Sequence, residues 1–355
     1  MAKPTDVKKI LVRAPNWIGD AVMCLPALWA LKKAYPGAQV TVLAKGRVLP
    51  VFKASLTADN VIEYESSGKH KGIIGRIKLS QRIRALHFDL AVLFQNAFDA
   101  AFVSFISGIP QRAGYARDFR RLLLTVPVAV TDEIKKKHEV FYYLNIINAL
   151  EGKGRALPPT PPVPQLNLKK DIVAQAKAIL SEHGLDKKPI IGVAPGASYG
   201  PSKRWAPEKF AETLARLSRE SGFSIVILGG GDDKDACAKV ASLIGPSALN
   251  LAGKTTLDVA MALLGVFKVF VTNDSGLMHA ASALGTPTVA IFGSTDAAKT
   301  GPLGKNNRVV SKKTPCAPCF ERECRYRHYM CLNSISTDDV YITAVELLKK
   351  TKGRF

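Results

Sequence analysis

The sequence predicts an α/β protein with two Rossmann-like, doubly wound domains, each built on a parallel sheet. Two observations support this. Short β-branched runs alternate with helical patterns through most of the 355 residues, and the alternation stops at a proline-rich stretch and then restarts. Strands separated by helices of ten or more residues need right-handed crossover connections, which produce parallel sheets. A chain of this length is long enough for two domains, each with its own core.

The first domain is expected to cover residues 1–160. The apolar run Ala21–Ala34 predicts a helix that ends before Pro36 and Gly37. Strands are predicted at Lys9–Arg13, Gln39–Leu43, Val61–Tyr64 and Leu90–Phe94. Leu157–Pro164 then places five prolines in eight residues, which is incompatible with a helix or a central strand. We interpret this stretch as the linker.

The second domain is expected to cover residues 161–335. Strands are predicted at Pro189–Val193, Ser224–Leu228, Lys268–Thr272 and Thr288–Phe292, and helices at Asp171–His183, Ala206–Ser221 and Ser275–Leu284. A last helix, Thr337–Lys350 within residues 336–355, has too few neighbours in sequence to form a domain. We expect this helix to pack back across both domains. The two domains should face each other across a cleft.

Composition and charge limit the class of protein. The chain is 47% hydrophobic and carries a formal net charge of +21. No apolar run approaches the roughly 20 residues that a membrane helix needs, and no signal peptide is evident, so we expect a cytoplasmic protein. The charge indicates an anionic partner. A nucleic acid is not expected, because no helix-turn-helix, zinc-finger or RNP signature accompanies the basic residues.

Two loops that follow predicted strands have the residues of a phosphate site. Ala194–Trp205 combines glycines with Ser198 and Lys203, and Asn273–Gly276 opens a helix. Backbone amides at a helix N-terminus and a nearby lysine suit a diphosphate. Each loop also has a plainer interpretation: an ordinary Gly/Ser loop in the first case, and a helix cap with an interior histidine at His279 in the second. Because ligands bind at the carboxyl ends of parallel strands, the two loops together favour a nucleotide site.

Asp20 lies at the start of the first helical segment, where a dinucleotide-binding protein would have no acid. A pyrophosphate beside this carboxylate would be repelled, so we place the nucleotide in the second domain. The helix dipole favours the ionised carboxylate, which suits a general base acting on a hydroxyl. An ordinary first-turn helix acid is the alternative. A dehydrogenase is not expected, because no G-x-G-x-x-G motif opens either domain.

Four segments carry a family resemblance, which runs from about Ile10 to Ile335. They are NWIGDAVMCLPAL, FQNAFDAAFVSFISGIPQRAGYARDFRRLLLT, APGASYGPSKRW and TNDSGLMHAASALGTPTVAIFGSTDAAKTGP. The chain resembles the ADP-heptose:lipopolysaccharide heptosyltransferases, inverting GT-B glycosyltransferases, and within them it looks most like the heptosyltransferase II group. Heptosyltransferases I and III, or another nucleotide-sugar enzyme of the same fold such as an epimerase, remain alternatives.

The resemblance implies a role for each matching residue. Asp20 would be the base that deprotonates the acceptor, and Lys203 would bind the donor, ADP-heptose, and neutralise the leaving diphosphate. Further donor contacts would come from Ser198, Asp274, Ser275, Gly276 and His279. Anionic groups of the acceptor, a lipid A–Kdo–heptose at the inner face of the cytoplasmic membrane, would meet Asn96, Arg112, Arg120 and Arg121. No cofactor is implied: Lys203 and helix dipoles would replace the usual cation, making transfer metal-independent.

A cysteine-rich segment near the C-terminus stands apart from these motifs. Cys316, Cys319, Cys324 and Cys331 have the spacing C-x2-C-x4-C-x6-C, with His328 among them. Four thiols that converge could hold a structural zinc ion. The alternative, which we favour, is a set of reduced and partly buried cysteines.

Overall fold

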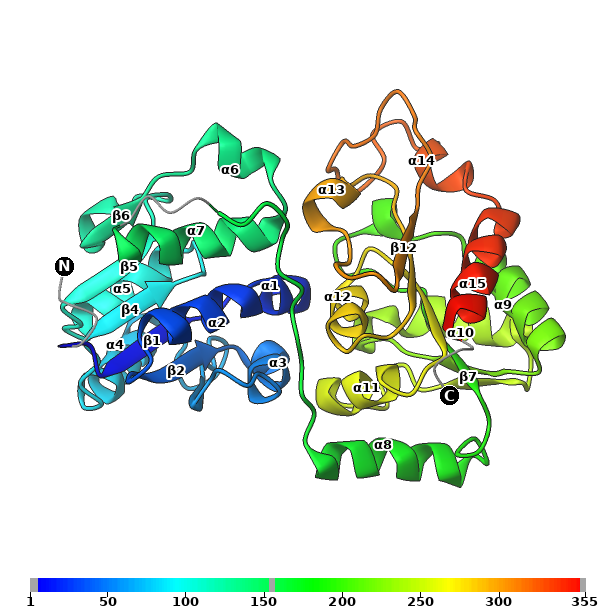
Figure 1. Cartoon of the computed structure of the whole chain (residues 1–355), viewed down its shortest axis with the longest axis horizontal. Coiled ribbons are helices and arrows are strands. Elements are labelled where there is room, and N and C mark those ends of the chain that lie inside the picture. The colour runs from blue at the N-terminus through cyan, green and yellow to red at the C-terminus, as the bar shows by residue number, and fades with distance from the viewer. Residues whose placement is uncertain (1–5, 153–156, 352–355) are drawn as a thin grey trace. The chain divides into compact units, whose positions relative to one another are not determined.

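The computed structural model describes residues 6–152 and 157–351. Contacts within the chain divide it into two compact units, Met1–Asn167 and Leu168–Phe355. Each unit has one six-stranded sheet with helices on its faces (Figure 1). The predicted fold class is therefore confirmed. No helix in the described parts of the chain is long and apolar enough to cross a bilayer.

The sheet of the first unit is parallel throughout and has the order β3-β2-β1-β4-β5-β6. Its strands are β1 (Lys9–Arg13), β2 (Gln39–Ala44), β3 (Asn60–Glu63), β4 (Leu90–Leu93), β5 (Gln111–Tyr115) and β6 (Val126–Val128). β1 lies at the centre, where Val12 pairs with Val42 on one side and Val92 on the other. Both faces are covered, which explains the nearly continuous apolar sequence of β1, β2 and β4.

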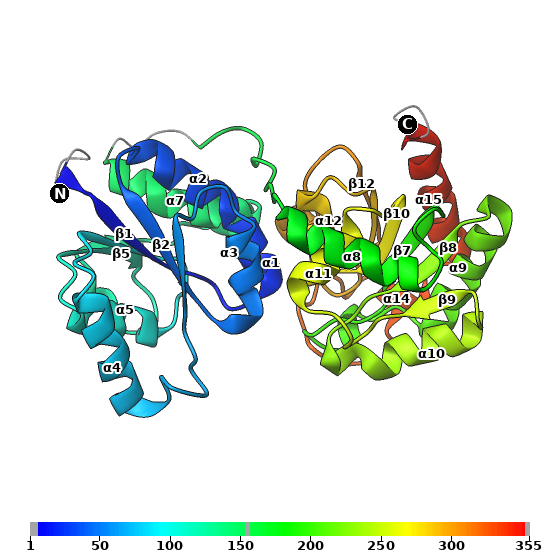
Figure 2. The same ribbon diagram turned by 90° about the horizontal axis from the view of Figure 1, so that it is seen from below.

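The helices of the first unit are α1 (Ile18–Met23), α2 (Leu25–Ala34), α3 (Leu49–Lys53), α4 (Gly72–Arg84), α5 (Phe98–Ile106), α6 (Asp132–Lys136) and α7 (Glu139–Glu151). Figure 2 shows α2 and α7 on one face of the sheet and α4 and α5 on the other. The single helix predicted over Ala21–Ala34 is two helices, α1 and α2, which meet at Cys24. Pro26 lacks the N–H that would continue the helix through this point, so the chain starts a new one.

The sheet of the second unit is also parallel and repeats the same plan, in the order β12-β11-β10-β7-β8-β9. Its strands are β7 (Ile190–Ala194), β8 (Ser224–Ile227), β9 (Ala248–Asn250), β10 (Val269–Asn273), β11 (Thr288–Ile291) and β12 (Asn307–Val310). All residues of β7, β10 and β11 are buried, as expected for central strands covered on both faces.

The helices of the second unit are α8 (Lys170–Glu182), α9 (Pro207–Ser221), α10 (Lys234–Ile244), α11 (Leu257–Leu264), α12 (Gly276–Ala283), α13 (Ala297–Thr300), α14 (Met330–Asn333) and α15 (Thr337–Thr351). The last helix, α15, packs on α9 and on β10, β11 and β12 of its own unit. Val340, Ala344 and Leu347 are buried in the core there. Its expected reach to the other unit stays a prediction.

The strand order creates one switch point in each unit. A switch point lies between two neighbouring strands whose connections run to opposite sides of the sheet. In the first unit these strands are β1 and β4: the chain passes from β1 to β2 and β3 on one side, and from β4 to β5 and β6 on the other. In the second, β7 and β10 are the corresponding neighbours. Ligands of open α/β sheets bind outside the carboxyl ends of the two strands that flank such a point. The loops after β1, β4, β7 and β10 therefore lie on the ligand side of the two sheets.

Candidate active site

In the second unit, the loops after β7, β10 and β11 bring a charged group of residues together. Lys203 Nζ lies 2.5 Å from Asp274 Oδ2, and the two side chains are only 14% and 6% exposed. Thr295 Oγ1 donates to the same carboxylate oxygen at 2.6 Å. This enclosed ion pair lies at the switch point, where a lysine with three N–H donors can also bind an anionic ligand.

Buried polar contacts hold these loops in place. Asn273, at the end of β10, is fully buried. Its Nδ2 donates to the carbonyl of Pro195 (2.7 Å), and its Oδ1 accepts from the backbone N–H of Trp205 (3.1 Å). One side chain thus fixes both ends of the loop that carries Lys203. Loss of this amide would leave buried backbone groups without partners.

The predicted helix cap is present at the start of α12. Ser275 Oγ accepts from the backbone N–H of Met278 (3.3 Å), and Gly276 is the first residue of the helix. His279, one turn further on, is 7% exposed and belongs to the buried part of α12. Ser198 lies exposed in the loop after β7. α12 thus begins two residues after Asp274, with Ser275 as its N-cap.

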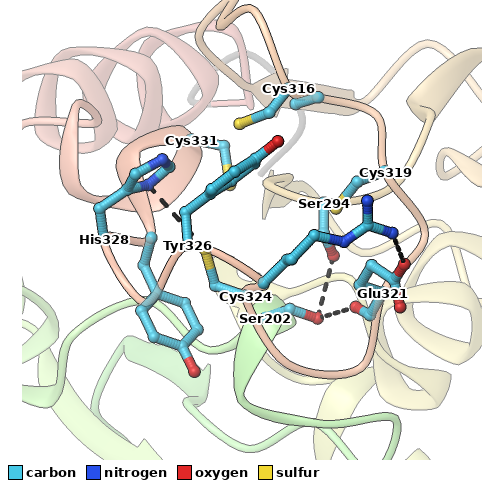
Figure 3. Close-up of a pocket in the computed structure, with 12 residues that line it drawn as sticks. Ser202, Ser294, Cys316, Cys319, Glu321, Cys324, Tyr326, His328 and Cys331 are labelled. Atoms are coloured by element: carbon cyan, nitrogen blue, oxygen red, sulfur yellow. Dashed lines mark hydrogen bonds and ion pairs between the residues drawn. The ribbon is translucent and has the colours of Figure 1, made fainter.

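The cysteine-rich segment forms hydrogen bonds with the loop that carries Lys203. The backbone N–H of Ser202 donates to the carbonyl of Arg322 (3.1 Å), and Tyr199 Oη donates to the carbonyl of Phe320 (2.5 Å). Ser202 Oγ also donates to the carbonyl of Glu321 and accepts from Ser294 Oγ. Figure 3 shows these serines at the base of the cavity that the segment encloses.

The four clustered cysteines line this cavity, whose volume is about 190 Å³ (Figure 3). Cys331 is buried, Cys319 is exposed, and all four are free thiols. Yet within residues 6–152 and 157–351, no group of three or more His, Cys, Asp or Glu side chains is arranged to hold a metal ion. The four cysteines line one cavity, and the structural zinc ion that their spacing suggests stays a prediction.

The thiols of this cluster differ in acidity. Burial, followed by the neighbouring sulfur atoms of Cys316, Cys319 and Cys324, raises the pKa of Cys331. At Cys324, slight burial also acts to raise the pKa. Hydrogen bonds from several backbone N–H groups to its sulfur have the larger combined effect, so the pKa of Cys324 is lowered. At a given pH, Cys324 therefore has a larger thiolate fraction than Cys331.

In the first unit, Asp20 lies in the first turn of α1, after β1 and so at the switch point. Tyr143 of α7 donates its Oη hydrogen to Asp20 Oδ1 (3.0 Å). Burial, and then the charge of Asp20, raises the pKa of Tyr143 well above its usual value. Tyr143 consequently stays protonated and fixes the orientation of the carboxylate.

Asn96 follows β4, on the other side of the same switch point. Its Nδ2 donates to Tyr142 Oη (2.8 Å), and its Oδ1 accepts from Arg120 (3.0 Å). Arg120 is fully buried and also donates to the carbonyls of Tyr115 (2.8 Å) and Gln95. Burial lowers its pKa to about 10. The expected direct contact of Arg120 with an acceptor does not match this position, because its guanidinium is enclosed by protein carbonyls.

The other two predicted arginines differ in exposure. Arg112, in β5, donates to the carbonyls of Leu123 (2.6 Å) and Ile109, and its guanidinium lies 5.3 Å from the ring centroid of Phe105. Burial lowers its pKa. Arg121 is exposed, next to Leu122, whose side chain is also exposed. Of the three arginines, Arg121 is the one that presents its charge to solvent.

Two functional partners were missing from the sequence prediction. Tyr143 lies 123 residues from Asp20, and Thr295 lies 21 residues from Asp274. Tyr143 belongs to an apolar helical run that indicates only core packing. Thr295 follows the predicted strand that ends at Phe292, so the rule that identified the other loops also applies to it.

Comparison with known proteins agrees with this geometry. Residues 76–330 match glycosyltransferase family 9 (heptosyltransferase). The chain is 32% identical to lipopolysaccharide heptosyltransferase 2 of Escherichia coli K12, over 85% of this chain and 87% of that protein. It is 28% identical to lipooligosaccharide heptosyltransferase 2 of Campylobacter jejuni, over 97% and 99%.

Solved structures show the same fold. The structure of E. coli ADP-heptose lps heptosyltransferase II superposes with a TM-score of 0.82 at 29% identity, covering 97% of this chain and 99% of that one. A family 9 glycosyl transferase from Veillonella parvula superposes with a TM-score of 0.86 at 24% identity, over 97% and 98%. The chain thus has the GT-B architecture of two Rossmann-like units, and it belongs to glycosyltransferase family 9, the heptosyltransferases.

Proposed function

We propose that this chain is heptosyltransferase II: it transfers a heptose from ADP-L-glycero-D-manno-heptose to the first heptose of the lipopolysaccharide inner core, with inversion. The observation that carries the proposal is the similarity along nearly the whole chain to proteins named heptosyltransferase 2 from several bacteria. The similarity to heptosyltransferases 1 and 3 is lower, at 26% and 25% identity.

On the donor side, Lys203 binds the diphosphate and neutralises the charge that develops as ADP leaves. Its position after β7 and its enclosure with Asp274 support this role. Asp274 accepts hydrogen bonds from heptose hydroxyls, while backbone amides of Ser275 and Gly276 at the start of α12 bind phosphate oxygens. Ser198 and His279 complete the donor contacts. No metal ion is required in this scheme, because Lys203 supplies the positive charge.

On the acceptor side, Asp20 acts as the general base. As the acceptor hydroxyl oxygen attacks the anomeric carbon, its proton passes to the carboxylate, the bond from that carbon to the phosphate oxygen breaks, and the electron pair leaves with ADP. A single displacement needs one base and a stabilised leaving group. The hydrogen bond from Tyr143 supports this assignment, since it orients the carboxylate without sharing its ionisation.

The acceptor carries carboxylate and phosphate groups on a lipid. Asn96, Arg112 and Arg121 are proposed to face it, with Arg120 acting as a positioning residue through its bond to Asn96. Arg121 lies among Phe119 and Leu122, which are 99% and 91% exposed. Apolar side chains beside a free guanidinium suit an amphiphilic ligand. We propose accordingly that the protein works in the cytoplasm, peripherally at the inner membrane face, and that nucleic acid is not a partner.

The test uses three acceptors: lipid A–Kdo cores that carry no heptose, one heptose or two. The purified chain is incubated with each acceptor and radiolabelled ADP-heptose. Product from the one-heptose core alone is the expected result. Product from the heptose-free core would assign heptosyltransferase I activity, product from the two-heptose core would assign heptosyltransferase III activity, and either result would overturn the proposal.

A further inference from the structure

Helix α4 of the first unit carries an apolar stripe on its solvent side. Ile73, Ile74 and Ile77 are 55%, 68% and 43% exposed. Ile77 follows Ile74 by three positions and Ile73 by four, so it is a neighbour of both on the helix surface. Single exposed apolar residues are ordinary, but three isoleucines gathered on one helical turn are typical of a surface that has a partner.

Basic residues predominate around this stripe, and two of them, Lys69 and Arg76, form ion pairs with Glu65 and Asp99. Residues 66–88 contain six lysines or arginines and neither aspartate nor glutamate. Lys71, Lys78 and Arg82 are exposed on or next to α4. Lys78 and Arg82 continue the row that begins at Ile74, because they follow at intervals of four residues. The exposed side of α4 is therefore apolar over its first turns and basic over its last.

The opposite side of α4 is anchored in the protein. Leu79 and Ile83 are buried in a core cluster with Leu11 and Leu93 of the sheet. Arg76 forms an ion pair with Asp99 of α5. Figure 2 shows α4 beside α5 at the margin of the first unit. The exposed isoleucines are thus not needed to hold the helix in place, and a stable helix presents them outward.

From this arrangement we infer that the exposed side of α4 binds the surface of an anionic phospholipid bilayer, with Ile73, Ile74 and Ile77 inserted among the headgroups. The inference rests on the proposed function only in that the acceptor is a lipid. Exposed apolar side chains gain free energy when they are buried at the headgroup level of a bilayer, and each basic residue near an anionic surface adds attraction.

The experiment measures flotation with vesicles free of acceptor, made either of phosphatidylcholine alone or with phosphatidylglycerol. We expect wild-type protein to float with the anionic vesicles. The variant Ile73→Ser/Ile74→Ser/Ile77→Ser should partition at least about tenfold less. The variant Lys71→Gln/Lys78→Gln/Arg82→Gln should lose the preference for anionic vesicles.

Matched controls remove similar groups from the second unit. Leu243→Ser/Ile342→Ser removes exposed apolar side chains there, and Lys177→Gln/Lys187→Gln/Lys349→Gln removes the same charge. Both should float as the wild type does. If the triple variant folds poorly, the single variant Ile74→Ser, at the most exposed of the three isoleucines, is used for the same flotation measurement. Equal flotation of the wild type and both α4 variants would overturn the inference. It would also be overturned if the protein forms a dimer that the isoleucine variant disrupts and this variant floats as the wild type does.

Activity measurements separate this inference from the proposed function. On a water-soluble acceptor without acyl chains, the α4 variants should turn over as fast as the wild type, whereas turnover on vesicle-embedded acceptor should fall. If wild-type protein transfers heptose to neither acceptor, the proposed function fails and flotation still tests the surface. If transfer is normal but α4 changes affect neither flotation nor vesicle turnover, only the bilayer inference fails.

Discussion

At the scale of single residues, the structure separates two adjacent arginines that look equivalent in the sequence. Arg120 is fully buried and donates to Tyr115, Gln95 and Asn96, whereas Arg121 is exposed. A buried guanidinium that loses its chain leaves several acceptors without donors. We therefore expect Arg120→Met to lower the free energy of unfolding by about 2–4 kcal/mol.

The matched change Arg121→Met should alter the free energy of unfolding by no more than about 0.5 kcal/mol, because its side chain is solvated. Chemical denaturation of both variants measures the difference. Arg120→Lys should not restore stability, since an ammonium group cannot reproduce the planar set of donors. Equal stability of the Arg120 and Arg121 variants would contradict the structural role given to Arg120.

At the scale of elements, a single glycine controls the loop between β7 and α9. Gly200 has φ +156°, and a Cβ there would clash with the backbone carbonyl oxygen of Arg322. The neighbour is backbone of the cysteine-rich segment, so it cannot rotate away. Gly200→Ala should therefore displace the loop that carries Lys203 and raise the Michaelis constant for ADP-heptose about tenfold or more, which steady-state kinetics would measure.

Gly222 provides the control for that substitution. It ends α9 with φ +72°, and nothing lies within 4 Å of a Cβ added there. Gly222→Ala should cost about 1 kcal/mol of stability through backbone strain and leave donor binding unchanged. If both variants bind donor equally well, the loop does not depend on its packing against the cysteine-rich segment.

The same elements show how far a sequence can be interpreted alone. Long β-branched strands such as β1, β7 and β10 were predicted at nearly their observed bounds, because burial on both faces leaves a clear apolar run. Four strands were not predicted. The inner strand β5 begins with the polar residues Gln111 and Arg112. The edge strands β6, β9 and β12 have three, three and four residues, and β6 has Pro127 at its centre. Such edge strands owe their pairing to the sheet beside them and have little signal of their own.

In the candidate site, too, residues with a local sequence signal were predicted and those that depend on distant contacts were not. Lys203 and Asp274 were predicted because strand ends mark the ligand side of a parallel sheet. The bond from Tyr143 to Asp20 and the enclosure of Arg120 depend on contacts between distant segments. Neither composition nor periodicity contains that information, and only the assembled fold supplies it.

At the scale of the whole molecule, the contacts described for Asp20 and Lys203 belong to different units. If the first unit activates the acceptor and the second binds the donor, Asp20→Asn should lower kcat by about 10²- to 10⁴-fold while the Kd for ADP-heptose stays the same. Lys203→Met should weaken donor binding instead. Calorimetric titration and single-turnover kinetics on the full chain measure the two effects separately.

Double-mutant cycles on the donor Kd make this division quantitative. Asp20 and Lys203 should be additive within about 0.5 kcal/mol, as independent sites are. Lys203 and Asp274 should couple by more than about 1 kcal/mol, because Lys203→Met alone leaves a carboxylate that is 6% exposed without its counter-charge, and Asp274→Asn removes that penalty. Strong coupling of Asp20 to donor affinity, or none between Lys203 and Asp274, would show that the two units do not divide the reaction in this way.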